Sequence, residues 1–365
     1  VRFATRGGLY SHVGALPAAV STGYTAYPTL AAVASTSDFT INADSICTYF
    51  TNINTTGNIK FAPNASTFDY AATMNAATWY TNWYGPYKSV QIGKPGTNGG
   101  NQSSADISVD KLSATGDIKL YGGTITLKGG ATTSETSGTG VLVKATGDIV
   151  VNAGSSTTRN PVSVTGTSST APVTLWSNAD ATGGGAVSLG YYVDVITQGA
   201  AIKIGGSAAA SDTEPTGYAE GSNATYCDGV NIGTSQVATD GNKIWSNGGD
   251  ITIRGKNTYN AGSCMGIKVF SGANINSGAG AIVLDGIAAG PTGGNNGHGV
   301  ELNWNGGYNT TVTSADTTGT AISITGRSSG TSTNGRGIVE WAGSATSRTT
   351  ISATAGGDIS LVGSP

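Results

Sequence analysis

The chain has 365 residues, of which 57 are glycine, and only 11% of its residues are charged. The formal net charge is −3 and there is no basic run, so the chain lacks the electrostatic footprint of a protein that binds nucleic acid or an anionic membrane. No stretch approaches the roughly 20 apolar residues of a membrane span. Residues 1–3 include neither a start methionine nor an apolar signal region, so we expect a processed product or a fragment of a longer protein.

Residues 1–100 differ from the rest of the chain because they hold most of its aromatic residues. The phrases Phe39–Asn42 and Asn58–Phe61 still alternate as strands do. We therefore expect irregular first strands that act either as a cap or as a surface for docking another molecule. A group of exposed aromatic rings could stack on sugar rings, although a core or cap role is the more common alternative, and the candidate residues are Trp79, Trp83, Tyr84 and Tyr87.

Residues 101–365 repeat short apolar phrases between glycine-rich turns, as in Gly116–Leu120, Gly147–Val151 and Ala201–Ile204. One longer polar segment near residues 207–227 interrupts them, and we expect it to be a loop that projects from the main body.

The repeat is clearest after residue 228, where rows begin with glycine at positions 229, 266, 299 and 337, in steps of 37, 33 and 38 residues. A second phrase in each row ends with glycine at positions 255, 286, 326 and 363. A degenerate period of this size, made of short strands and turns, is typical of a solenoid. The sequence predicts an all-β fold, a right-handed parallel β-helix over residues 101–365, because parallel crossovers are overwhelmingly right-handed.

Alternation within the second phrase of each row assigns one set of side chains to the core. We expect these residues to stack in register from one coil to the next: Ile251, Ile253, Ile282, Leu284, Ile322, Ile324, Ile359 and Leu361. Glycines such as Gly255 and Gly286 would serve as corners, where the chain turns without a Cβ penalty. Strict alternation would bury Glu340 together with Ile338, so we expect a bulge that turns Val339 and Trp341 inward.

Two of the three cysteines hold the same place in consecutive rows. Cys227 lies three residues before Val230, and Cys264 lies three residues before Ile267. Neighbouring strands lie about 4.8 Å apart, which suits the Cα separation of about 4.4–6.8 Å in a disulfide. We expect a disulfide between coils and therefore an oxidising, extracellular setting; two stacked thiols are the alternative. Cys47 would then be a buried thiol or pair with another chain.

Several phrases together resemble the passenger regions of filamentous haemagglutinin-like bacterial exoproteins, and they are Val90–Gly96, Gly116–Leu127 and Pro172–Asp180. The resemblance covers roughly residues 55–365. It implies a secreted or cell-surface adhesin built as a β-helix, with glycans or proteins of a host or neighbouring cell as partners. The Asn-Pro-Asn-Gly phrase of the family's secretion domain is absent from this sequence.

The sequence contains no constellation typical of catalysis, of a cofactor site or of a metal site. Hydrolases built on β-helices need clustered carboxylates. Asp250 and Asp358 share a row position, but Ala281 and Ala321 lie between them in the stack. His298 precedes a corner glycine, and we expect it to be exposed there. We therefore predict that the chain is not an enzyme.

The sequence favours an extracellular structural or adhesive β-solenoid of a bacterial cell surface. One alternative is a subunit that assembles head to tail with further copies of itself into a filament or sheath. A second alternative is a carbohydrate-binding or carbohydrate-active β-helix.

Overall fold

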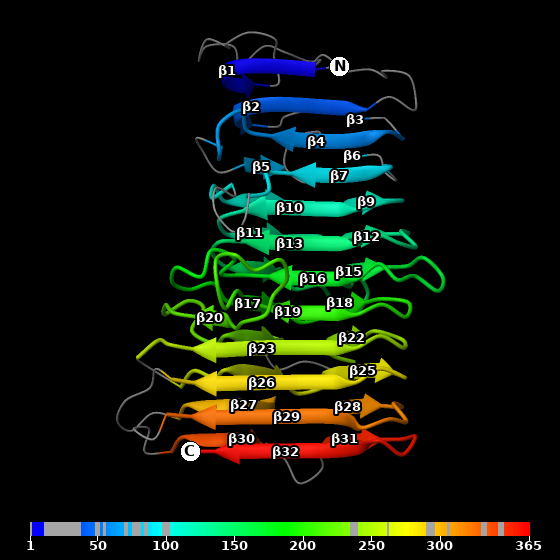
Figure 1. Cartoon of the computed structure of the whole chain (residues 1–365), viewed down its shortest axis with the longest axis vertical. Helices are drawn as coiled ribbons and strands as arrows, with labels where there is room; N and C mark the ends of the chain where they lie inside the picture. The colour runs from blue at the N-terminus through cyan, green and yellow to red at the C-terminus, as the bar shows by residue number, and fades with distance from the viewer. Residues whose placement is uncertain are drawn as a thin grey trace.

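The computed structural model shows a parallel β-helix whose coils stack along the long axis of the molecule (Figure 1). It describes residues 2–10, 38–47, 52–53, 56–68, 72–74, 82–83, 87–96, 103–233, 240–260, 263–289, 296–304, 307–329, 334–341 and 347–365. In 2–10, 41, 43–47, 52–53, 72–74 and 82–83, only the backbone is described. Every ladder between named strands is parallel in this part of the chain, which confirms the predicted all-β fold of stacked parallel coils; the right-handed sense of the coils stays a prediction.

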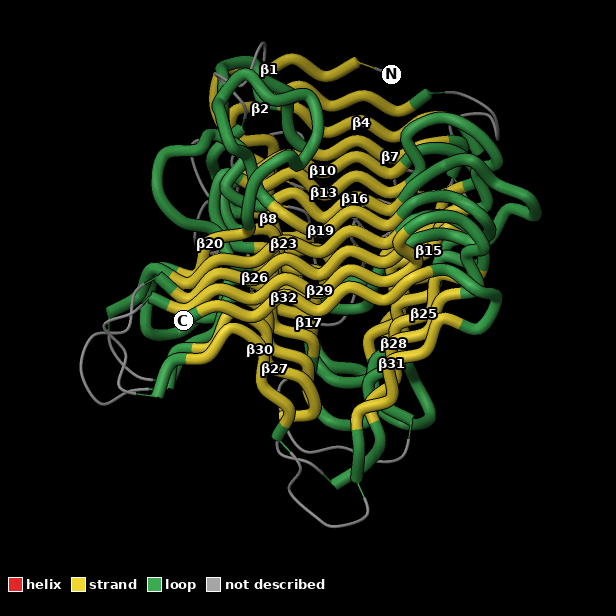
Figure 2. The backbone as a smooth tube through the Cα atoms, turned by 60° about the horizontal axis from the view of Figure 1, so that its bottom comes forward, coloured by secondary structure: helices red, strands yellow, loops and turns green. Residues whose placement is uncertain are grey.

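Each regular coil supplies one strand to each of three faces, which surround a common core (Figure 2). The first face contains β4 (Asn58–Ala62), β7 (Ser89–Ile92), β10 (Ile118–Gly122), β13 (Val141–Ala145), β16 (Val173–Trp176), β19 (Ile202–Gly205), β23 (Ile251–Asn257), β26 (Ile282–Ala288), β29 (Thr320–Ser328) and β32 (Asp358–Ser364). The second face contains β5 (Ala72–Met74), β8 (Ile107–Val109), β11 (Ile125–Leu127), β14 (Ile149–Val151), β17 (Val187–Leu189), β21 (Val230–Ile232), β24 (Ile267–Phe270), β27 (His298–Trp304) and β30 (Arg336–Glu340). The third face contains β9 (Leu112–Ala114), β12 (Ala131–Thr133), β15 (Asn160–Val164), β18 (Val193–Ile196), β22 (Lys243–Trp245), β25 (Asn274–Gly278), β28 (Thr310–Ser314) and β31 (Thr349–Ala353).

The interior is filled by apolar side chains that stack in register along each face. On the first face Ile251, Ile282 and Ile322 are register partners, and each is 0% exposed. The neighbouring positions Ile253, Leu284 and Ile324 form a second ladder that is equally buried. Fully burying one such side chain stabilises a fold by about 1.5–3 kcal/mol. The predicted core ladders are confirmed up to Ile322 and Ile324; Ile359 and Leu361 stack in register with them on β32, but they are exposed, so their predicted burial was wrong.

The row alignment of the second face is also confirmed. Val230 pairs with Ile267, Ile267 with Val300, and Val300 with Ile338. Most of the difference between the unequal steps therefore lies in the loops, because the first core position of each second-face strand stays in register.

The repeated glycines have a different role from the one predicted. Gly286, on the first face, and Gly299, at the start of the second-face strand, are not in the left-handed region of φ. They lie so close together that a Cβ on Gly286 would overlap the carbonyl oxygen of Gly299. The same overlap would arise between Gly255 and Gly266 and between Gly326 and Gly337. The interpretation as corners that need a free φ was wrong: these positions require glycine because two backbones pack directly against each other.

The parallel stack extends across the boundary expected near residue 100. Within 1–100, β1 (Arg2–Tyr10) pairs with β2 (Phe39–Cys47), β2 pairs with β4, and β4 pairs with β7. Beyond the boundary β7 pairs with β10 in the same sheet. The short strands β3 (Asn52–Ile53) and β6 (Asn82–Trp83) form a separate parallel pair. A cap or docking role for residues 1–100 stays a prediction.

The segment expected to project near residues 207–227 lies along the first face. Its strand β20 (Ala219–Gly221) pairs with the end of β23, where Ala219 is the partner of Gly255. An antiparallel bridge between Gly206 and Gly217 closes the base of the segment. The segment is thus bound to the solenoid at both ends.

The bulge expected at Val339 is absent, although Val339 itself is buried. Strand β30 pairs with β27 without a bulge at Val339, Glu340 is exposed, and Trp341 is 45% exposed, so the expected inward turn of Trp341 was wrong. One register shift lies a coil earlier, between β24 and β27, where Asn303 adopts a φ of 60°.

Candidate functional site

The predicted disulfide joins two neighbouring coils of the second face. Cys227 and Cys264 are bonded, with a Cα separation of 5.5 Å and a sequence separation of 37 residues. The next residue, Asp228, accepts a hydrogen bond from the backbone N–H of Met265 at 2.7 Å. Together these bonds fix the loops that lead into β21 and β24.

The aromatic residues proposed to stack on glycans are only partly within the described residues. Tyr87 is fully buried, so its ring belongs to the core and offers no face to a sugar, contrary to that prediction. Burial raises the pKa of its hydroxyl far above its ordinary value. The backbone of Trp83 lies in β6, whereas the side chains of Trp79, Trp83 and Tyr84 lie outside the described residues.

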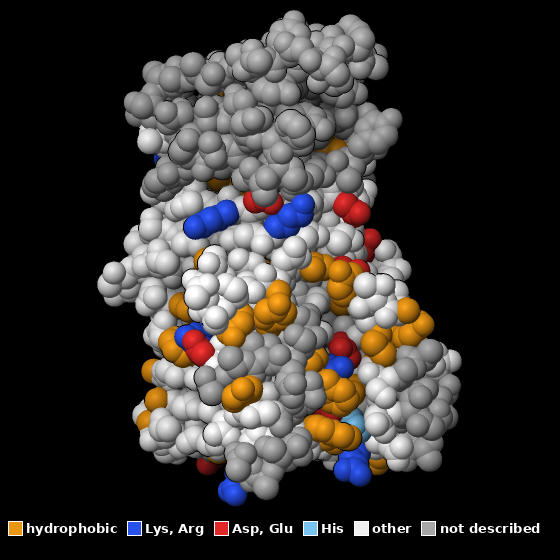
Figure 3. All heavy atoms as spheres, turned by 180° about the vertical axis from the view of Figure 1, so that it is seen from behind, with side chains coloured by type: hydrophobic (Ala, Val, Ile, Leu, Met, Phe, Trp, Pro, Cys, Tyr) orange, Lys and Arg blue, Asp and Glu red, His pale blue; other side chains and the backbone are white. Residues whose placement is uncertain are grey.

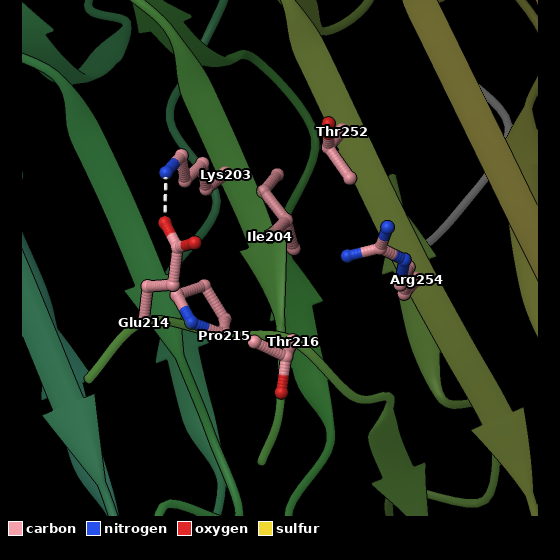
Figure 4. A pocket seen from close by; sticks show the side chains of 7 residues that line it. All are labelled: Lys203, Ile204, Glu214, Pro215, Thr216, Thr252 and Arg254. Carbon is pink, nitrogen blue, oxygen red and sulfur yellow. Dashed lines mark hydrogen bonds and ion pairs between the residues drawn. The ribbon is translucent and has the colours of Figure 1, made fainter. Parts of the chain in front are cut away.

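A pocket of about 320 Å³ opens between the first face and the segment that lies along it (Figure 4). Its floor is the outer side of β19 and β23, and its other wall is residues 214–216. The lining residues are Lys203, Ile204, Glu214, Pro215, Thr216, Thr252 and Arg254. Register pairing of Lys203 with Thr252 places these two side chains next to each other on the outer side of the sheet.

Only some of the charged side chains in and beside this pocket form ion pairs. The ammonium of Lys203 forms an ion pair with Glu214. Arg327 donates to Asp285 at 2.5 Å. Arg254 is without an ion pair in the part of the chain that the structure describes. The pocket can therefore accept a negatively charged group.

A second cluster lies on the outer side of the second face, where Asn231, Lys268 and Glu301 follow one another in register. Glu301 is 0% exposed, and neither carboxyl oxygen has a hydrogen-bond partner. Burial raises its pKa to about 8 against the opposing effect of the Lys268 charge, so the carboxyl is largely protonated at neutral pH. Burial also raises the pKa of Asp228, whose Oδ2 lies 3.7 Å from Lys268 Nζ.

Aromatic rings border this cluster in a column formed by Phe270, Trp304 and Trp341. Lys268 Nζ lies 4.4 Å from the ring centroid of Trp304, a cation–π distance. The Trp304 and Trp341 centroids are 5.5 Å apart. Hydrophobic and charged side chains lie close together on this side of the lower coils (Figure 3). The cluster was not predicted, although Lys268 and Glu301 hold the same position in consecutive rows of the sequence.

His298 was expected to be an exposed corner, and this was wrong, because it is only 4% exposed. It begins strand β27 and pairs with Arg336 instead of lying in a turn. Burial, and to a lesser degree the nearby Arg336 charge, lowers its pKa to about 4, so the imidazole is neutral at neutral pH.

Among the described residues, no three His, Cys, Asp or Glu side chains gather as ligands for a metal ion. The same residues contain no helix long and apolar enough to cross a membrane. Comparison with protein-family models, curated proteins and solved structures finds no match to the chain.

Proposed function

We propose that the chain is part of an extracellular β-solenoid with a structural or adhesive role, similar to the passenger regions of filamentous haemagglutinin-like exoproteins. The observation that carries this proposal is the apolar core, which continues from Ile59 on β4 to Ile324 on β29. Because stacked side chains fill the interior, interactions with other molecules take place on the outer faces. The disulfide between Cys227 and Cys264 supports an oxidising location outside the cell.

The partners in this proposal are glycans or proteins on the surface of a host or neighbouring cell. The outer faces offer two places with groups available for binding. One is the pocket beside Arg254 on the first face, and the other is the exposed ring of Trp341 on the second face. Each combines an apolar surface with nearby charge.

Adhesion can be tested with beads that carry the oxidised full chain and with cultured epithelial or bacterial cells. We expect the beads to bind cells and soluble chain to compete. Beads carrying albumin provide the baseline. Equal retention of both kinds of bead would contradict an adhesive role.

Head-to-tail assembly is a second candidate function, favoured by the exposed strand β32. Ile359 and Leu361 are 43% and 53% exposed, although their register partners Ile322 and Ile324 are fully buried. Because all stacked strands run parallel, the open edge of β32 would pair in parallel with the strand at the opposite end of a second copy. Such a contact is heterologous and non-closing, so it would extend into a filament.

Light scattering and negative-stain microscopy of the full chain test this second candidate. Rods several molecules long are expected, and the Leu361→Lys variant should shorten them by placing a charge in the contact. The Ser360→Lys variant is the control, because this residue lies between the two core positions and faces outward. A chain that stays monomeric at high concentration would rule out assembly.

A further inference from the structure

The pocket on the first face contains Arg254, whose neighbour Asp285 already accepts hydrogen bonds from two other side chains. Asp285 is the register partner of Arg254. Its Oδ1 accepts a hydrogen bond from Arg327 Nη2 at 2.5 Å, and its Oδ2 accepts one from the Tyr218 hydroxyl at 2.7 Å. Arg327 Nη2 also lies 2.8 Å from the Tyr218 oxygen, which closes the network. No hydrogen bond or ion pair joins the Arg254 guanidinium to any residue that the structure describes.

The other cation of the pocket is neutralised. Lys203 pairs with Glu214, and this pair is open to solvent, with side chains 38% and 56% exposed. Arg254 is half-buried and points across the pocket toward Ile204 and Thr216 (Figure 4). The pocket therefore carries one uncompensated positive charge, which a bound anion would balance at a partly desolvated position.

The wall formed by residues 214–216 is held in place by hydrogen bonds within its own segment and at the base of that segment. Asp212 Oδ2 accepts hydrogen bonds from the Ala208 N–H at 2.7 Å and from the Thr216 hydroxyl at 2.5 Å. At the base of the segment, Trp176 Nε1 donates to Ser207 Oγ at 2.9 Å. A wall that is already ordered lowers the entropic cost of binding.

We propose that this pocket binds the carboxylate of an acidic sugar residue. This inference rests on the proposed adhesive function and deepens it by naming the class of ligand. The planar fork of Arg254 matches a carboxylate with two parallel N–H···O bonds. Thr252 supplies a hydroxyl for a sugar hydroxyl, and the buried Pro215 forms part of the rigid wall of the pocket. A volume of about 320 Å³ lies at the lower end of the roughly 300–1,000 Å³ of small-molecule sites, which suits a single ring.

Titration of the full chain with D-glucuronate and with D-glucose, followed by NMR and calorimetry, tests the proposal, because these sugars differ only at C6, which is a carboxylate in glucuronate and a hydroxymethyl group in glucose. We expect glucuronate to bind and glucose to bind at least about tenfold more weakly, as for the loss of one charge-assisted hydrogen-bonded group. Arg254→Gln should weaken glucuronate binding by a similar factor. Arg348→Gln, which removes an exposed arginine on another face, should leave binding unchanged.

Two results would overturn the proposal. Equal affinity for glucose and glucuronate would show that the carboxylate is not recognised, and inorganic sulfate binding as tightly as glucuronate would show an unselective anion site. Circular dichroism checks the fold of each variant. Where Arg254→Gln fails to fold, Arg254→Lys keeps the charge but loses the fork, and it should still bind glucuronate several-fold more weakly than the unchanged chain.

The bead assay distinguishes this inference from the proposed function. If beads carrying Arg254→Gln adhere to cells as well as the unchanged chain, adhesion stands and the pocket is not its site. If soluble glucuronate binds through Arg254 but the beads do not adhere, the pocket stands and the adhesive function fails.

Discussion

The first and second faces each bury ladders of apolar side chains, but the residues on their outer sides differ. On β23, β26 and β29 the residues between the ladder positions are small or β-branched and half-buried: Thr252, Val283 and Ser323. The equivalent positions of β24 and β27 hold Lys268 and Glu301, and Glu301 is fully buried. An outward-facing position in a strand is therefore not always a solvated one. Alternation shows which way a side chain points, whereas the neighbouring loops and rings decide whether water reaches it.

The buried apolar ladders, which both faces have, should contribute most to the stability of the fold. Ile282→Ala is expected to cost about 2–5 kcal/mol of unfolding free energy, because it leaves a cavity between coils. Ile359→Ala, at a position that is 43% exposed, should cost about 1 kcal/mol or less. Denaturant unfolding followed by circular dichroism measures both. Equal costs would mean that the terminal coil is covered in solution.

The disulfide should stabilise the second face in particular. Replacing both Cys227 and Cys264 by serine is expected to cost roughly 2–4 kcal/mol, since the bond closes a loop between residues 37 positions apart. Hydrogen exchange should quicken in β21 and β24 more than in β26. A uniform change over both faces would indicate that the coils unfold only as a whole.

The buried Glu301 should make the second face sensitive to pH. Its folded pKa of about 8 lies above the ordinary 4.5, so between these values the carboxyl is protonated in the folded state and ionised in the unfolded state. Its contribution to stability is therefore complete below pH 4.5 and is lost as the pH rises toward 8.

The Glu301→Gln variant has no carboxyl to ionise at this position. Its free energy of unfolding should therefore be about 1–3 kcal/mol higher than that of the unchanged chain at pH 9. At pH 4 the two should differ little. Thermal unfolding across this pH range checks the prediction, and the same change at the exposed Glu214 is the control. An identical pH profile for the Glu301→Gln variant and the unchanged chain would show that Glu301 is solvated.

The smallest effect on stability is expected for the exposed pair on the first face. Glu214→Gln should change unfolding free energy by less than about 1 kcal/mol, as is usual for surface ion pairs. The same change frees Lys203, so glucuronate should bind a few-fold more tightly. Weaker binding in this variant would show that Glu214 positions the ligand instead of competing with it.

The fold was largely predictable because period-2 alternation and the row period depend on local sequence. The ladder through Ile282 and the pairing of Cys227 with Cys264 both followed from row positions. The burial of His298 and Glu301 was not predictable in this way, because it depends on contacts that the row alignment does not contain. The pocket beside Arg254 needed three separate segments to meet, so no single phrase of the sequence indicated it.

The direct contact between backbones at Gly286 and Gly299 recurs in neighbouring coils, at Gly255 with Gly266 and at Gly326 with Gly337. The rows beginning at Gly266, Gly299 and Gly337 are separated by unequal steps, of 33 and 38 residues. Each turn nevertheless returns to the same contact, so a residue gained or lost in a loop alters that turn alone and its effect is not carried to the next. Each glycine pair thus restores the strand register in its coil. Loops of different length and sequence are therefore compatible with the same solenoid geometry.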